Sequence, residues 1–64
     1  MEPHQQRVVD EQTELQAKSA KLAEFIKSSS IFSGLDRHQR GLLKAQYSAM
    51  QTYGEILALR IASF

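Results

Sequence analysis

The stretch LKAQYSAMQTYGEILALRIASF, residues 43–64, decides the fold of this chain. Its larger apolar residues and one glycine recur at alternating intervals of four and three, at Leu43, Tyr47, Met50, Gly54, Leu57, Ile61 and Phe64. That spacing is the a/d signature of a helix that packs along its length against a partner helix. We call these seven residues the seam.

A second stripe runs beside the seam on the same predicted helix. We call it the outer face, and it consists of Leu42, Gln46, Ala49, Tyr53, Ile56 and Arg60. The two stripes together cover more of the helix than a single partner helix can bury. The sequence therefore predicts a chain that associates with other copies of itself.

The size of the chain favours the same conclusion. Sixty-four residues form one domain, residues 1–64, and a domain of this size buries only about 60% of its unfolded surface. Such small folds usually rely on disulfides, a metal or oligomerisation. The chain has no cysteine, and His4 and His38 lack the spacing of a metal site. Oligomerisation remains as the expected source of stability.

The first half of the chain predicts a second long helix. Pro3 suits a first helical turn, and no glycine or proline follows until Gly34. Val8, Leu15 and Leu22 recur every seven residues, so we expect a helix over about 4–28. Three serines, at positions 28–30, then lower the helical propensity.

The connection between the helices is expected to be a loop over 29–35, with Ile31 and Phe32 plugging the closed end. Asp36 is a candidate N-cap, and Gln39 completes the pattern of a capping box. The second helix then runs over about 37–62. The predicted fold class is all-α: an antiparallel two-helix hairpin that assembles into a helical-bundle homo-oligomer, at least a dimer.

Charge and motifs exclude several classes of function. The net charge is +1, which argues against a general polyanion binder. No segment is long and apolar enough to span a membrane, and the N-terminus lacks a signal-peptide pattern. No nucleotide-loop, hydrolase or metalloprotease motif is present. We therefore expect no enzymatic activity, no cofactor and no metal.

One polar set on the outer face has a pattern that suits ligand binding. Gln46, Tyr53 and Arg60 are spaced seven residues apart, so they line up along one face of the helix. An aromatic ring can stack on a base, an amide can bind its edge, and a guanidinium can bind phosphate. The same residues also have purely structural explanations: a tyrosine at an interface, an arginine near a helix C-terminus and a glutamine that fixes the packing register.

Other residues are candidates to join this set. Tyr47 lies on the seam, where packing is its ordinary role, and Lys44 supplies positive charge nearby. In an antiparallel hairpin, Arg7 comes near the C-terminal half of the second helix and can join Arg60. Gly54 indicates a close approach of another backbone or of a ligand. The predicted ligand-binding residues are Arg7, Lys44, Gln46, Tyr47, Tyr53 and Arg60.

The sequence also resembles a known family over roughly residues 4–61. The matching residues include Arg7, Phe32, the run LLxxQxxAMxxY from Leu42 to Tyr53, and Arg60. They resemble a widespread family of short tailed-phage proteins, named after a gene product of a crAss-like gut phage. This resemblance implies a phage-encoded accessory protein that acts in the cytoplasm of the host.

More distantly, the hairpin resembles phage anti-CBASS and anti-Thoeris sponge proteins, at Gln46 and Met50. Those proteins are small oligomers, often hexamers, that sequester cyclic nucleotide immune signals without cleaving them. The resemblance implies a dimer-based homo-oligomer, with a hexamer as one form, that binds a cyclic nucleotide or related phosphorylated signal between protomers.

Two alternatives remain at this point. The outer face could dock a host protein and inhibit it, as a protein-interaction module does. Nucleic acid could bind the basic residues Arg37, Arg40 and Lys44, although the net charge of +1 and the acidic N-terminal region argue against this partner.

Overall fold

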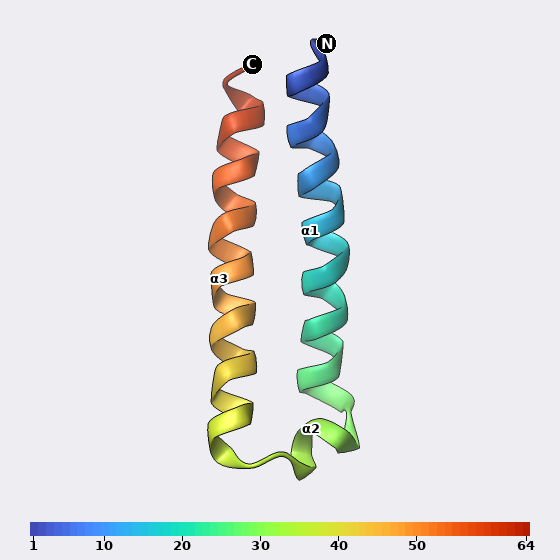
Figure 1. The fold of residues 1–64 in the computed structure, drawn as a ribbon, viewed down its shortest axis with the longest axis vertical. Coiled ribbons are helices and arrows are strands. Elements are labelled where there is room, and N and C mark those ends of the chain that lie inside the picture. The colour runs from blue at the N-terminus through green and yellow to red at the C-terminus, as the bar shows by residue number, and fades with distance from the viewer.

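The computed structural model describes all 64 residues and contains three helices and no strand. The long helices are α1 (Pro3–Ser28) and α3 (Arg37–Ala62), and the short helix α2 (Ser30–Gly34) lies between them. Figure 1 shows α1 and α3 running antiparallel, with α2 at one end of the hairpin and both termini at the other. The predicted all-α class with a long helix pair is confirmed.

One serine separates α1 from α2. Ser29 has extended backbone angles, φ −79° and ψ 129°, and therefore ends α1. Its side-chain Oγ accepts a hydrogen bond from the backbone N–H of Ile31 at 3.1 Å, which caps the first turn of α2. The expected loop over 29–35 is wrong in this respect, because Ser30–Gly34 forms a helical turn.

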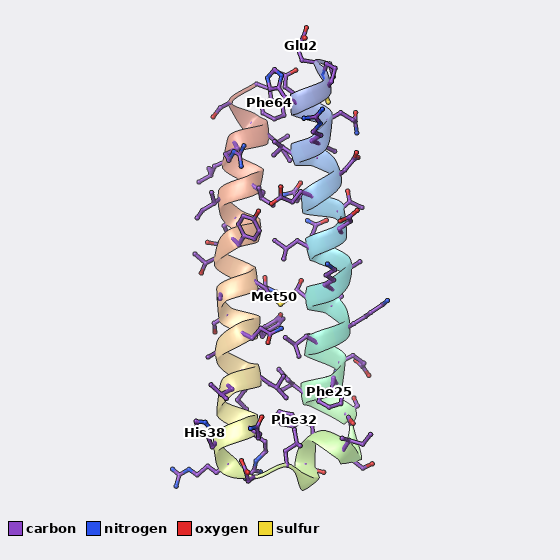
Figure 2. The ribbon with its side chains drawn as sticks, in the orientation of Figure 1. Glu2, Phe25, Phe32, His38, Met50 and Phe64 are labelled. Atoms are coloured by element: carbon purple, nitrogen blue, oxygen red, sulfur yellow. The ribbon has the colours of Figure 1, made fainter.

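The closed end of the hairpin is plugged by one of the two residues expected there. Phe32 is 7% exposed and packs against the ring of Phe25, as Figure 2 shows. Ile31 is 69% exposed, so its predicted burial is wrong. Adjacent residues of a helix point about 100° apart, and α2 turns only one of them inward.

Helix α3 begins at an aspartate cap, as predicted. The side-chain Oδ1 of Asp36 accepts a hydrogen bond from the N–H of Gln39 at 2.8 Å. The reciprocal bond of a capping box, from the N–H of Asp36 to the Gln39 side chain, does not form. From this cap, α3 covers the same residues as the helix expected over 37–62.

The seam of α3 faces α1. Leu57 is fully buried, and Leu43, Tyr47, Met50, Gly54 and Ile61 are half-buried. Figure 2 shows Met50 directed toward the space between the long helices. Phe64 is 48% exposed, because it follows the end of α3. Its predicted place in the packed seam is therefore wrong.

Helix α1 meets this seam with residues at the same alternating spacing. They are Gln5, Val8, Gln12, Leu15, Ser19, Leu22 and Ile26. Ser19 is buried at 8% exposure, and its Oγ donates a hydrogen bond to the carbonyl of Gln16 at 3.2 Å. With polar residues at three of these positions, the hairpin buries only three apolar side chains, those of Val8, Phe32 and Leu57.

Gly54 does not mark a close approach between the two backbones. A Cβ atom built on Gly54 would meet only Cδ2 of Leu15, at 3.7 Å. That distance is an ordinary van der Waals contact. The seam therefore has room for an alanine at this position, and the expectation of a close backbone approach is wrong within the hairpin.

Candidate functional site

The polar line predicted on the outer face lies on one uninterrupted helix. Gln46, Tyr53 and Arg60 are all exposed on α3, and Tyr53 is 42% exposed. Two turns of helix separate each from the next, which is about 10 Å along the axis. The three side chains therefore form a row along the outside of the hairpin.

Exposed apolar side chains lie on the outer face and next to it. Leu42 is 51% exposed, Ile56 is 49% exposed and Leu59 is 69% exposed. An aromatic ring and aliphatic side chains beside an amide and a guanidinium provide both stacking and hydrogen-bonding groups. The sequence predicted the exposure of Leu42 and Ile56, whereas Leu59 was outside both predicted stripes.

The register of the hairpin follows from the contact of Leu15 with Gly54. Since α1 and α3 run antiparallel, residues whose numbers add to about 69 lie level with each other. Arg7 is thus level with Ala62, within one turn of Arg60. Both arginines are exposed.

Arg7 and Arg60 also project from the same side of the hairpin. Gln16 of α1 and Gln51 of α3 line one groove between the helices. Arg7 precedes Gln16 by nine residues, and Arg60 follows Gln51 by nine residues. Nine residues make about two and a half turns, so both arginines lie on the side opposite this groove. Arg7 is therefore on the same side of the hairpin as the row of the outer face, level with its Arg60 end.

The other two predicted ligand-binding residues are placed elsewhere. Lys44 precedes Gln46 by two residues, which is about 200° around the helix, so the two point to nearly opposite sides of α3. Tyr47 is half-buried in the seam. The structure thus separates Lys44 and Tyr47 from the row formed by Gln46, Tyr53 and Arg60.

Lys44 belongs instead to a basic cavity at the closed end. This cavity of about 430 Å³ is lined by Phe32, Arg37, Arg40, Gly41 and Lys44. The three cations occupy positions 37, 40 and 44 of one helical face, near the positively polarised N-terminus of α3. The sequence showed this basic turn, but its association with the phenyl ring of Phe32 depends on α2.

Two further features are not found. No group of three or more histidine, cysteine, aspartate or glutamate side chains is placed to hold a metal ion. No helix is long and apolar enough to cross a membrane.

Comparison with known proteins gives one match. Residues 2–63 match the model of a protein family described as Sequestin. No curated protein and no solved structure matches the chain.

Proposed function

Because the chain belongs to the Sequestin family, we propose that it is a phage counter-defence protein that binds and sequesters a cyclic nucleotide immune signal without cleaving it. The family name itself suggests the sequestering of a ligand. The class of ligand follows from the resemblance to phage sponge proteins, and the phage origin and the action in the host cytoplasm follow from the resemblance to the tailed-phage family.

The observation that carries the proposal is the row of Gln46, Tyr53 and Arg60 on the outer face. The exposed ring of Tyr53 offers a surface on which a base stacks, and the amide of Gln46 can donate to or accept from the polar edge of a base. The guanidinium of Arg60 forms charge-assisted hydrogen bonds with a phosphate. Arg7 lies on the same side of the hairpin as Arg60 and adds a second cation near the Arg60 end of the row.

Sequestration requires affinity and abundance rather than a chemical step. A sub-micromolar dissociation constant corresponds to about 8 kcal/mol of binding free energy or more. Stacking contributes about 1–3 kcal/mol per base, and a hydrogen bond to a charged group contributes about 1.5–3 kcal/mol. A few such contacts are enough, provided that the protein is present in excess over the signal.

Calorimetry against a panel of cyclic dinucleotides, cyclic trinucleotides and cyclic ADP-ribose isomers tests the proposal. We expect sub-micromolar binding of at least one compound. Heat denaturation of the complex should then release that compound unchanged, as chromatography and mass spectrometry can measure. Failure of every compound to bind would contradict the ligand class, and recovery of a hydrolysed product would contradict sequestration without cleavage.

A second candidate function is supported by exposed aliphatic side chains on the outer face of α3 and next to it. Leu42, Ile56 and Leu59 could dock against an apolar groove of a host protein. A host protein that copurifies in stoichiometric amounts, and is lost when Leu42 and Ile56 are both replaced by aspartate, would favour this function over ligand binding.

A further inference from the structure

The outer face of α3 is nearly symmetric about Ala49. Leu42 and Ile56 lie seven residues before and after Ala49, and they are exposed to nearly the same degree, 51% and 49%. Gln46 and Tyr53 lie three residues before and four residues after it. A small residue therefore occupies the centre, with a large aliphatic residue at the same distance on each side.

We propose that two copies of the chain pack through their outer faces, with α3 antiparallel to the partner's α3 and the two-fold axis at Ala49. In this register Leu42 faces the partner's Ile56, and Ala49 faces the partner's Ala49. Tyr53 is level with the partner's Gln46 to within one residue, about 1.5 Å along the axis. Each Tyr53 then completes a binding site together with the partner's Gln46.

A second copy is the occupant that the small core of the hairpin favours. The isolated hairpin buries only three apolar side chains, which is a small core for 64 residues. A stable dimer buries about 600 Å² or more on each partner, roughly an eighth of the 4886 Å² surface of this chain. Helix α3 offers a face about 39 Å long for this purpose.

Charge and helix dipoles favour the antiparallel arrangement. Parallel packing in register would place Arg60 beside the partner's Arg60 and align the two helix dipoles. Antiparallel packing opposes the dipoles and separates the two Arg60 residues by about 30 Å along the axis.

The partner chain also shortens the separation between a tyrosine and a glutamine of the row. On one α3, two turns of helix separate Gln46 from Tyr53. In the antiparallel pair, Tyr53 and the partner's Gln46 are level and lie along the same edge of the interface. A base stacked on Tyr53 is then within reach of the partner's amide. The nature of the ligand rests on the proposed function, whereas the packing of the two α3 helices does not.

Disulfide trapping tests the packing directly, because the natural chain has no cysteine. Cysteines that face each other in this register can form a disulfide, which needs Cα atoms about 4.4–6.8 Å apart. Under mild oxidation we expect most of the Ala49→Cys variant to form a covalent dimer. Leu42→Cys alone and Ile56→Cys alone should stay monomeric on a non-reducing gel, whereas their equimolar mixture should form the mixed dimer.

Gln51→Cys is the matched control, since Gln51 is exposed on the side of α3 that lies away from this interface. All four positions are exposed or half-exposed, and circular dichroism verifies that each variant is helical. Cross-linking of Leu42→Cys with itself would establish parallel packing and overturn the proposal. Absence of cross-linking in both Ala49→Cys and the mixture would overturn it as well.

Tethered heterodimers then test the shared site. Leu42→Cys and Ile56→Cys chains are joined, with Tyr53→Ala on one chain and Gln46→Ala on the other. In this heterodimer one Tyr53 still faces an intact partner's Gln46, so we expect one binding site per dimer for the panel compound that the natural chain binds most tightly. Placing both alanines on one chain disrupts both shared sites and should abolish binding.

The reverse pattern, with binding only when both alanines are on one chain, would show that Gln46 and Tyr53 act within one chain. If no panel compound binds the natural chain, the proposed function fails and the shared site fails with it. The disulfide result still decides whether α3 packs as proposed, so the two failures are distinguishable.

Discussion

The ring of Phe32 in α2 meets the ring of Phe25 in α1 edge to face, with centroids 6.0 Å apart and an angle of 79° between their planes. This is a favourable aromatic geometry. It fixes the short helix α2 against the end of α1 and thereby closes the hairpin.

Loss of this contact should weaken the fold. Replacement Phe32→Ala removes one of three buried apolar side chains, so we expect the free energy of unfolding to fall by about 3 kcal/mol. Ile31→Ala is the neighbouring control and should change it by less than about 0.5 kcal/mol, because Ile31 is exposed. Urea denaturation measures the free energy of unfolding of both variants. Equal losses in the two would contradict the assignment of Phe32 as buried in the core and Ile31 as exposed.

Replacement of Gly54 by alanine should stabilise the chain by about 1 kcal/mol, because alanine has the higher helix propensity and its Cβ meets only Leu15 at 3.7 Å. Gly41→Ala, whose Cβ meets nothing within 4 Å, should give a similar gain. Thermal denaturation compares the two. Stabilisation at Gly41 together with destabilisation at Gly54 would reveal another chain packed tightly against Gly54.

The cap of α3 should contribute measurably to stability. Asp36→Ala removes the acceptor for the N–H of Gln39 and should lower the free energy of unfolding by about 1 kcal/mol. Asp36→Asn keeps a capping oxygen and should lose only a small part of that amount. An equal loss in both variants would indicate that the charge of Asp36, rather than its hydrogen bond, stabilises the helix.

Association through the outer face should make thermal stability depend on protein concentration. The melting temperature should rise with concentration, since the dimer forms from folded chains. Ile56→Glu should lower the melting temperature and remove this dependence, whereas Gln51→Glu adds the same charge away from the interface and should preserve it. A melting temperature that is independent of concentration in the natural chain would contradict association.

Substitution of two cations on opposite sides of α3 distinguishes a ligand site on the outer face from one in the basic cavity. Arg60→Ala should weaken binding of the best panel compound by about 10-fold or more, the loss of one charge-assisted hydrogen bond. Lys44→Ala should change the affinity by less than about twofold, because Lys44 lines the basic cavity with Arg37 and Arg40. A large loss of affinity in Lys44→Ala and a small one in Arg60→Ala would indicate that the ligand binds in that cavity. Binding that survives Tyr53→Ala and Arg60→Ala together would also contradict the site on the outer face.

The long helices were predictable because their signals are local and repeated. The spacing of the seam identified α3 and the side of it that packs, and Asp36 gave its first turn. The short helix α2 was not predictable in the same way. A serine usually lowers helical propensity. Ser29 caps α2 only because its side chain accepts a hydrogen bond from the N–H of Ile31.

The grouping of the candidate ligand residues was predictable only in part. A spacing of seven residues correctly aligns Gln46, Tyr53 and Arg60 on any continuous helix. Proximity in sequence suggested that Lys44 would join them, but two residues of a helix place it on nearly the opposite side. The position of Arg7 required the register of the hairpin, which depends on the contact of Leu15 with Gly54.

The shape of the hairpin has a practical consequence for measuring its mass. The chain extends 46 Å along its longest axis and 15 Å along the next, so one protomer is about three times as long as it is wide. A rod of this kind diffuses more slowly than a sphere of equal mass. It should elute early from a gel-filtration column and mimic a larger assembly, so stoichiometry is best obtained from light scattering or sedimentation equilibrium, whose results are independent of shape.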